Sequence, residues 1–186
     1  IIFNGNGYDG NWIAEAERRG LSNLKSTADA LPAYISPKNI ELFVKHGIYT
    51  EEEVRARYEI HVENYTTVLS IEASTMIDMI RHEILPAVSK CAADLCERAF
   101  KKKETGSSCR YETATSQKLS ALTDTLMDGC VKLEADLAAV PSAPEKAMRY
   151  CHDVLIPDMT AARETADQLE TLTDAKAWPF PVYSEL

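Results

Sequence analysis

Apolar residues recur at steps of three and four between Thr50 and Phe100, which predicts one very long helix. Steps of this size place side chains on one face of an α-helix. Thr50 and Glu53 form the capping-box pattern that starts such a helix. A stripe this long needs other long helices to bury it. Its positions are Val54, Tyr58, Val62, Tyr65, Leu69, Ala73, Met76, Ile80, Ile84, Val88, Ala92, Leu95 and Ala99.

Two further long helices are predicted after a polar loop at 101–113. The first runs from about Thr115 to Val140, and its apolar residues recur at a mean step of about 3.5, close to a coiled-coil seam. The second runs from about Pro144 to Lys176. An aromatic, proline-rich tail follows and is expected to pack in extended form. Shorter helices are predicted at 11–19 (ended by Gly20), at 24–31 (ended by Pro32) and at 37–46 (ended by Gly47).

Two prolines, Pro86 and Pro157, lie well inside the predicted long helices. Proline has no N–H and clashes with the preceding turn, so it either kinks a helix or ends it. The apolar stripes continue in phase beyond both prolines, which favours a kink, and a true break stays open. The predicted fold is therefore all-α: a bundle of three long, partly proline-kinked antiparallel helices with short N-terminal helices.

Composition narrows the class of protein. A chain of 186 residues is long enough for one domain with a real core. Its net charge of -9 argues against nucleic acid and anionic membranes as partners, and no stretch has the roughly 18 apolar residues of a membrane span. The five cysteines include no C-x-x-C pair and are expected to be reduced, as in a cytoplasmic protein. The first residue is Ile1, not Met, so we expect a segment of a longer protein.

One sequence motif resembles a dinucleotide fingerprint. Gly5–Gly10 reads G-x-G-x-x-G, precedes a predicted helix, and has Asp29 at a suitable distance. The motif needs a βαβ unit, and the chain beyond it is predicted to be helical. We therefore interpret the motif as a turn.

Metal and nucleophile patterns are also weak. Bundles that bind two metals use Glu-x-x-His, but none of the histidines has a glutamate three residues before it. The Asp78–His82 pair is interpreted as a hydrogen bond, and the side chains of Cys151 and His152 point in different directions on a helix. The stretch 58–65 (YEIHVENY) is either packing or a contact with another domain or subunit. We predict no catalytic, cofactor-binding or metal-binding residue. The histidines are His46, His61, His82 and His152.

Several ordered segments resemble the C-terminal region of type III glutamine synthetases. The resemblance spans 3–183 and is weakest over 101–146. Its segments are FNGNGY (3–8), AEAERRGLSNLKSTADALPAYIS (14–36), LFVKHGIYTEEE (42–53), RYEIHVENY (57–65), IEASTMIDM (71–79), EILPAV (83–88) and WPFPVY (178–183).

The resemblance implies a parent glutamate–ammonia ligase of nitrogen metabolism, cytoplasmic and assembled as a ring-shaped homo-oligomer. That enzyme uses ATP and Mg or Mn, and the residues that bind them lie in upstream catalytic domains whose motifs are not found here. Residues 1–7 are then expected to join an upstream catalytic domain, and 8–186 to form a single helical C-terminal domain. Its partners would be that catalytic domain and neighbouring subunits. We expect this segment alone to be structural and inactive, with no cofactor of its own. The alternatives are a free-standing helical protein–protein interaction module and a metal-binding bundle enzyme.

Overall fold

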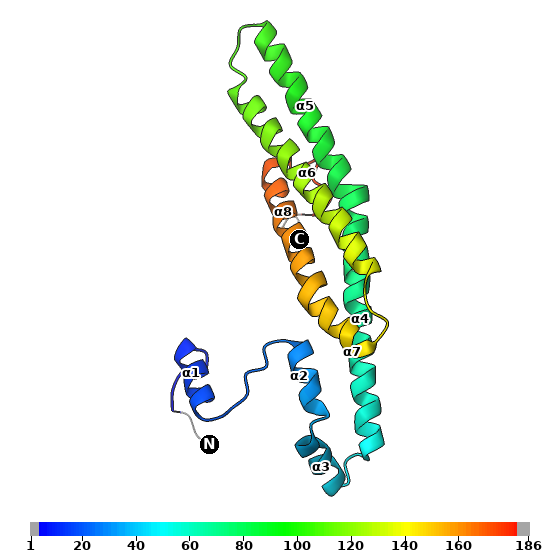
Figure 1. Cartoon of the computed structure of the whole chain (residues 1–186). Helices are drawn as coiled ribbons and strands as arrows, with labels where there is room; N and C mark the ends of the chain where they lie inside the picture. The colour runs from blue at the N-terminus through cyan, green and yellow to red at the C-terminus, as the bar shows by residue number, and fades with distance from the viewer. Residues whose placement is uncertain (1–3, 182–186) are drawn as a thin grey trace. The chain divides into compact units, whose positions relative to one another are not determined.

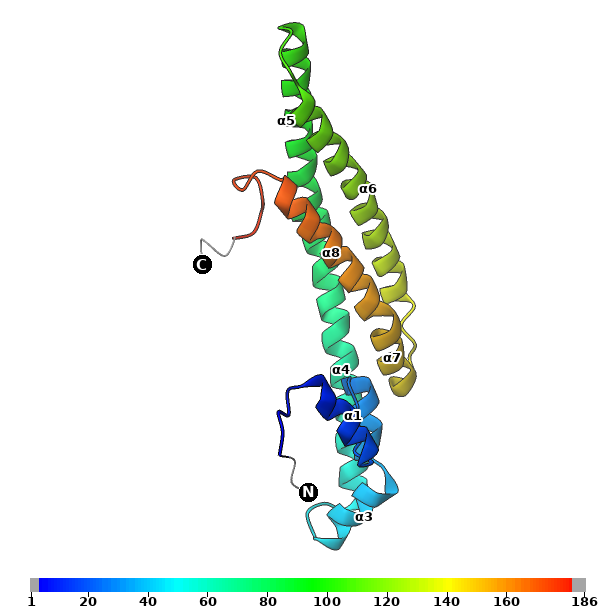
Figure 2. The same ribbon diagram turned by 90° about the vertical axis from the view of Figure 1, so that its left-hand side faces the viewer.

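The computed structural model describes residues 4–181 (Figures 1 and 2). Within these residues the fold is all-α, as predicted, and contains no strand. Contacts divide the chain into two compact units, 1–65 and 66–186, which are described separately. The expected junction at 1–7 lies partly outside the described residues and stays a prediction. The helices are α1 (Gly10–Arg18), α2 (Thr27–Tyr34), α3 (Pro37–Lys45), α4 (Glu51–Met79), the π-helical turn η1 (Ile80–Ile84), α5 (Leu85–Glu104), α6 (Arg110–Ala138), α7 (Pro144–Tyr150), the π-helical turn η2 (Cys151–Leu155) and α8 (Ile156–Leu172).

The short helices of the first unit end where the sequence predicted, except for α2. Gly20 and Gly47 follow α1 and α3 with φ of 72° and 62°, a conformation that glycine adopts without strain. The prediction that Pro32 ends α2 is wrong, because Pro32 lies inside that helix. Ser26 sets the start later than predicted, since its hydroxyl accepts a hydrogen bond from the N–H of Asp29 at 3.1 Å.

An aromatic cluster joins α2, α3 and the first half of α4. The ring of Phe43 lies 5.7 Å from Tyr34 and 5.7 Å from Tyr49, measured between centroids. The guanidinium of Arg57 stacks over Tyr49 at 4.5 Å, and His61 meets Tyr34 edge-on at 6.2 Å. Contacts of this kind stabilise beyond the area that they bury. Part of the stretch 58–65 is therefore used in internal packing.

The long helix starts at the predicted capping box. The N–H of Thr50 donates to Glu53 Oε2 at 2.8 Å, and the N–H of Glu53 donates to Thr50 Oγ1 at 3.2 Å. These bonds from Thr50 lower the pKa of the Glu53 carboxyl. Val54, one residue later, is fully buried. The helix therefore begins with the N–H groups of Thr50 and Glu53 hydrogen-bonded and with Val54 buried.

Replacing Thr50 with alanine is expected to destabilise the first unit by about 1 kcal/mol, because the cap of α4 loses its hydroxyl acceptor. Urea unfolding followed by circular dichroism measures the change. The matched control is Thr125→Ala in α6, whose exposed hydroxyl donates to the carbonyl of Ala121 in the same helix. That control should change stability little, since alanine is the best helix former. Equal effects of the two changes would contradict the capping role.

In the second unit, α6 packs closely against α5 on one side and α8 on the other (Figures 1 and 2). Among 66–181, no comparably close packing joins α8 to α4 or α5, so the exact three-helix bundle is not confirmed. The core combines the seam of α6 with residues of α5, η2 and α8. Its buried members include Val88, Leu95, Leu119, Leu126, Cys130, Leu133, Leu155, Met159, Ala162 and Leu169.

The loop between α5 and α6 is shorter than predicted. The sequence suggested a loop over 101–113, but α5 continues to Glu104 and α6 begins at Arg110. Lys101, Lys102 and Lys103 form the last turn of α5, where positive charge is favourable beside the C-terminal end of the helix dipole. These polar turns extend beyond the apolar stripe, so apolar periodicity alone did not reveal them.

Neither Pro86 nor Pro157 breaks its helix. Both prolines follow a π-helical turn, in which one N–H bonds to the carbonyl five residues earlier instead of four. The proline stands two residues after the last residue of the turn in each case, and the chain stays helical on both sides. The predicted kink stays a prediction. The bonds join the N–H of Leu85 to the carbonyl of Ile80, and the N–H of Ile156 to the carbonyl of Cys151.

The first π turn also keeps the buried face of the long helix aligned. A regular α-helix with 3.6 residues per turn rotates about 60° past four full turns between Ala73 and Val88. The wider turn of η1 holds an additional residue and takes up this excess. Ala73 and Val88 are both buried, and so are Ile77, Ile80 and Ile84 between them.

Candidate functional site

A groove of about 560 Å³ lies between α4–η1 and α8 in the second unit. We call it the α4–α8 groove and define it by Ile71, Met76, Met79, Ala166, Trp178 and Phe180. It exists because α8 packs closely on α6 but not on α4. A hollow of this size is typical of sites that take a ligand or the side chains of a partner.

The local sequence explains why the groove is apolar and open. Ala162 and Ala166 are one turn apart on α8, and both line the groove, so that wall carries only methyl groups there. After α8 the chain turns at Asp174, and Trp178 and Phe180 meet edge-on at 6.2 Å. The tail was predicted to pack in extended form. Residues 178–180 instead form bends, and 182–186 lie outside the described residues. Pro181 also lines the groove.

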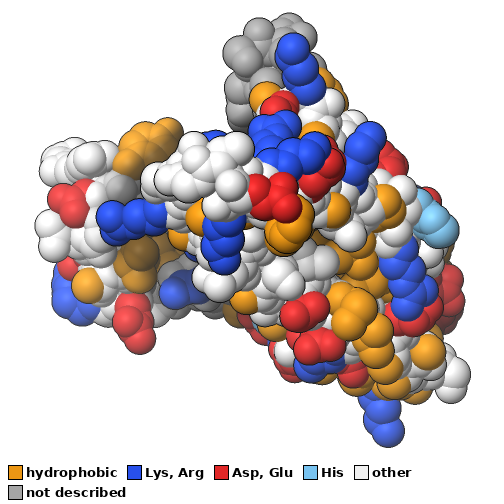
Figure 3. All heavy atoms as spheres, turned by 90° about the horizontal axis from the view of Figure 1, so that it is seen from above, with side chains coloured by type: hydrophobic (Ala, Val, Ile, Leu, Met, Phe, Trp, Pro, Cys, Tyr) orange, Lys and Arg blue, Asp and Glu red, His pale blue; other side chains and the backbone are white. Residues whose placement is uncertain are grey.

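The charged residues of the groove are mostly acidic. Glu72, Asp167 and Glu170 line it together with one cation, Arg163. Arg163 Nε donates to Asp167 Oδ1 at 2.8 Å, so that cation has an acidic partner already. Charged side chains of both signs and hydrophobic side chains are interspersed on the face of the molecule in Figure 3. The groove thus combines an apolar interior with a net negative rim.

Two ion-pair groups connect α6 to its neighbours. Arg81 in η1 donates two hydrogen bonds to the carboxylate of Glu134. The bond from Nη1 to Oε1 is 2.7 Å long. These bonds lower the pKa of the Glu134 carboxyl. Lys132 in α6 bonds to Asp136 at 2.9 Å and to Asp158 in α8 at 2.5 Å. These charges hold helices together, so their shifted pKa values have a structural explanation.

The hydroxyl of Tyr150 belongs to the second group. It donates to Asp136 Oδ1 at 3.2 Å. Lys132 is the main cause of the lowered pKa of Asp136, and burial is the main cause of the raised pKa of Tyr150. Burial likewise raises the pKa of the thiols of Cys130 and Cys151, which makes them poor nucleophiles.

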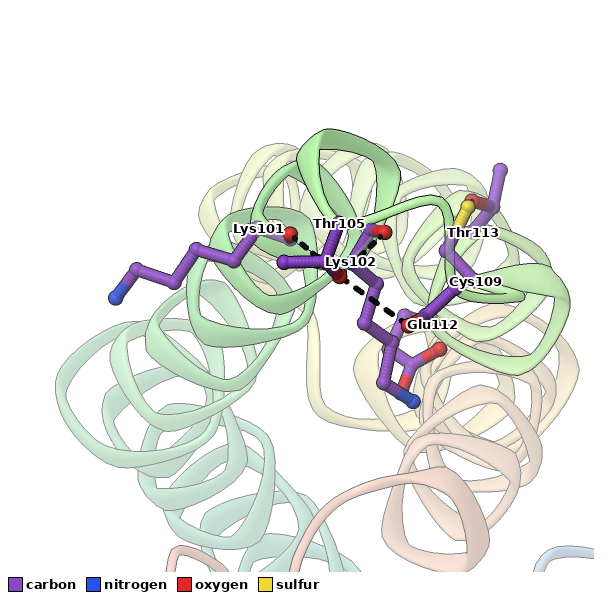
Figure 4. A network of polar contacts seen from close by, with 7 residues as sticks. Lys101, Lys102, Thr105, Cys109, Glu112 and Thr113 are labelled. Atoms are coloured by element: carbon purple, nitrogen blue, oxygen red, sulfur yellow. Dashed lines mark hydrogen bonds and ion pairs between the residues drawn. The ribbon is translucent and has the colours of Figure 1, made fainter.

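A smaller polar network closes the tip between α5 and α6 (Figure 4). Lys102 forms an ion pair with Glu112, which is only 6% exposed. Glu112 Oε2 has no hydrogen-bond partner in the described part of the chain. The hydroxyl of Thr105 donates to the carbonyl of Lys102 at 3.0 Å, and Thr113 Oγ1 lies 3.8 Å from Cys109 Sγ. The ion pair between Lys102 and Glu112 joins α5 to α6 but does not form a reactive centre.

The pKa of the Glu112 carboxyl is expected to lie below its ordinary value of 4.5, because Lys102 hydrogen-bonds the ionised form. A pKa lowered by folding adds stability above the ordinary pKa, and this stability is lost as the pH falls through the lowered value. Titration of the carboxyl carbon by NMR measures the pKa.

The control variants separate the pair from general acid effects. Lys102→Met should return the pKa of Glu112 toward 4.5. Lys101→Met should leave it unchanged, because Lys101 is paired with Glu97. A pKa that is the same with and without Lys102 would contradict the assignment.

The histidines and the glycine motif lie in ordinary surroundings. His82 Nε2 lies 3.4 Å from Asp78 Oδ1 on an exposed face, and His152 Nδ1 lies 2.6 Å from Asp153 Oδ1. No group of three His, Cys, Asp or Glu side chains that could hold a metal occurs within 4–181. Gly5–Gly10 forms a turn that leads into α1, which Asp9 caps. All five cysteines are free.

Within 4–181, every helix is too short or too polar to cross a bilayer.

The family model described as the glutamine synthetase C-terminal domain matches residues 1–103. This chain belongs to that family. The match covers α1 to α5, and with them the α4–η1 wall of the groove. The family resemblance inferred from the sequence segments is confirmed.

Curated relatives extend the match to the whole chain. Identity is 35% to a glutamine synthetase of Butyrivibrio fibrisolvens, 30% to the type-3 glutamine synthetase of Dictyostelium discoideum, and 30% to a glutamine synthetase of Bacteroides fragilis strain YCH46. Each alignment covers 100% of this chain but only 27%, 26% and 27% of the respective relative. The chain thus spans about a quarter of their length and corresponds to their C-terminal part.

The sequence patterns did not reveal the groove. The predicted stripe included Met76, but Ile77 is the buried residue and Met76 is half-buried. One signal was present: Ile71 lies off the stripe and is apolar, and in the structure it is 60% exposed. An apolar residue off the buried face indicates a surface to be covered, but not the identity of its partner.

Proposed function

We propose that this chain is the C-terminal helical domain of a type III glutamine synthetase. The parent enzyme would make glutamine from glutamate, ammonia and ATP, with Mg or Mn, in an upstream catalytic part. The observation that carries the proposal is the alignment of the whole chain with about a quarter of each relative. A location in the cytoplasm follows from the same proposal.

The role of this domain would be structural. It would pack on the catalytic part of the enzyme and contact neighbouring subunits of a ring-shaped homo-oligomer. Two features support this role. The groups with shifted pKa values, such as Glu134 and Asp136, are engaged in contacts between or within helices. The α4–α8 groove also presents apolar surface that a partner would cover.

The first test is enzymatic. The purified 186-residue chain, given glutamate, ammonia, ATP and magnesium, is expected to form no glutamine. The full-length protein that contains the chain should form it. Measurable turnover by the chain alone would refute the structural role.

The second test concerns assembly. Light scattering would compare the full-length protein with a version that lacks the α6–α8 region. Loss of the ring-sized particle is the expected result. An unchanged particle mass would contradict a role in assembly and leave only packing within one subunit.

The α4–α8 groove also favours a second candidate, a free-standing helical interaction module. The gene sequence upstream of Ile1 distinguishes the synthetase domain from the free-standing module. A reading frame that continues upstream of Ile1 into catalytic sequence supports the synthetase domain, and a start codon near Ile1 supports the free module.

A further inference from the structure

The α4–α8 groove is apolar surface that no residue within 66–181 covers. Ile71 is 60% exposed at its edge. Met76, Met79, Trp178 and Phe180 are half-buried around it. Apolar surface collected into one hollow is a frequent sign of a binding partner, in contrast to single exposed residues.

We propose that this groove is the docking site for a segment of the same polypeptide from outside these 186 residues. The segment would insert apolar side chains and carry Lys or Arg beside them. This inference rests on the proposed function, because it takes the chain to be part of a longer glutamine synthetase. It names the face through which the helical domain would meet the rest of its own subunit.

The shape and lining of the groove define the apolar part of the partner. About 560 Å³ accommodates several large side chains. Met76 and Met79 on one wall are flexible and polarisable, so they adapt to an irregular partner. Trp178 and Phe180 offer ring edges and faces for aromatic or aliphatic contacts.

The rim defines the charge of the partner. Glu72, Asp167 and Glu170 line the groove, and Arg163 is already paired with Asp167. A partner with acidic flanks would meet like charge, whereas Lys or Arg beside its apolar residues would meet opposite charge. Charge complementarity of this kind selects the partner and its register.

Charge also argues against a second copy of this chain as the partner. Each copy carries a net charge of -9, so an acidic rim would face an acidic surface.

A separate protein would have to contact more surface than the groove alone. Stable interfaces between separate proteins bury roughly 1,600 Å² of surface in total. The walls of one hollow offer less surface than that. A covalently linked segment has a high effective concentration and can dock with a smaller contact. The relatives provide such segments, since about three quarters of each relative lies outside the alignment.

The test places the photo-crosslinking residue p-benzoylphenylalanine at Ile71 of the full-length protein, with a second variant at Glu72. The matched control position is Val131 in α6, which is similarly exposed at 56% and does not line the groove. We expect Ile71 to crosslink to a peptide from outside the 186 residues that contains apolar residues and Lys or Arg. Its crosslink yield should exceed that of Val131 by about tenfold, as for a segment held at high effective concentration.

Isotope labelling identifies the source of the captured peptide. Rings assembled from heavy and light subunits should give crosslinks only within one isotope class. Crosslinks between classes, to a second copy of this chain, or to another protein would overturn the proposal. Absence of a crosslink from both Ile71 and Glu72 would also overturn it.

Hydrogen exchange gives an independent measurement. Exchange in α4 should be slower in the full-length protein than in the isolated chain, and Ile71→Glu should remove the difference while Val131→Glu should not. Equal exchange in both proteins would contradict docking. Glutamine formation by the full-length protein is assayed separately, so an active enzyme without groove contacts would refute the docking site and leave the proposed function standing.

Discussion

Replacing Leu126 with alanine is expected to lower the free energy of unfolding of the second unit by about 2–5 kcal/mol. Leu126 is fully buried in α6, the helix that packs on both α5 and α8. The change removes apolar contacts and leaves a cavity, because close-packed helices relax only partly around the gap. Urea unfolding of the chain, followed by circular dichroism, measures the loss.

The neighbouring residue provides the matched control. Met127 follows Leu126 on the same helix but is 49% exposed. Met127→Ala should therefore change stability by only about 0.5 kcal/mol, the usual range for a surface substitution. Similar losses of stability from both variants would show that α6 does not bury Leu126 and expose Met127.

Deleting Glu83 from the first π turn is expected to destabilise the second unit by about 3 kcal/mol, the usual penalty for proline inside a regular helix. The deletion removes the additional residue of η1, so the turn closes as a regular α turn. Pro86 then lies where its ring clashes with the preceding carbonyl. Glu83 itself is exposed, so the loss of its side chain contributes little.

A second substitution should restore most of that stability. With Pro86→Ala added to the Glu83 deletion, the backbone regains an N–H and loses the clash. The buried residues Ile80 and Ile84 would then be three apart and remain on one face. The same urea unfolding experiment compares the single and double variants. Equal stability of the two would contradict the coupling between the π turn and the proline.

Deletion of Lys90 is the matched control for register. Lys90 is exposed and lies in α5, beyond the π turn. Its removal would rotate the rest of α5 by about 100° and carry Leu95 off the core. Pro86→Ala should not rescue that variant. A rescue there would show that the proline, and not the register, controls the stability of α5.

Local patterns predicted the helices and their ends well. The capping box at Thr50, the glycines after α1 and α3, and the seam of α6 were readable because each depends on residues within a turn or two. The loop between α5 and α6 was predicted less well. Polar helical turns near Lys102 carry no apolar period, and the ion pair of Lys102 with Glu112 joins residues of two different helices.

The candidate site was beyond these patterns. The sequence predicted no catalytic, cofactor-binding or metal-binding residue, and the family match then connected the chain to glutamine synthetases. Nothing in the spacing of Ile71 or Ala166 indicated that they would line the same hollow. They lie on helices far apart in the sequence, and their proximity depends on how those helices pack.

The helical nature of this protein, the buried face of its long helices and its family are all evident from the amino-acid sequence. Periodicity and capping are local, so they survive without knowledge of the fold. The folded structure was needed to show that α8 packs closely on α6 but not on α4, and that a π turn precedes both Pro86 and Pro157. The distance between two helices is set by side chains from both, and no single stretch of sequence contains that information.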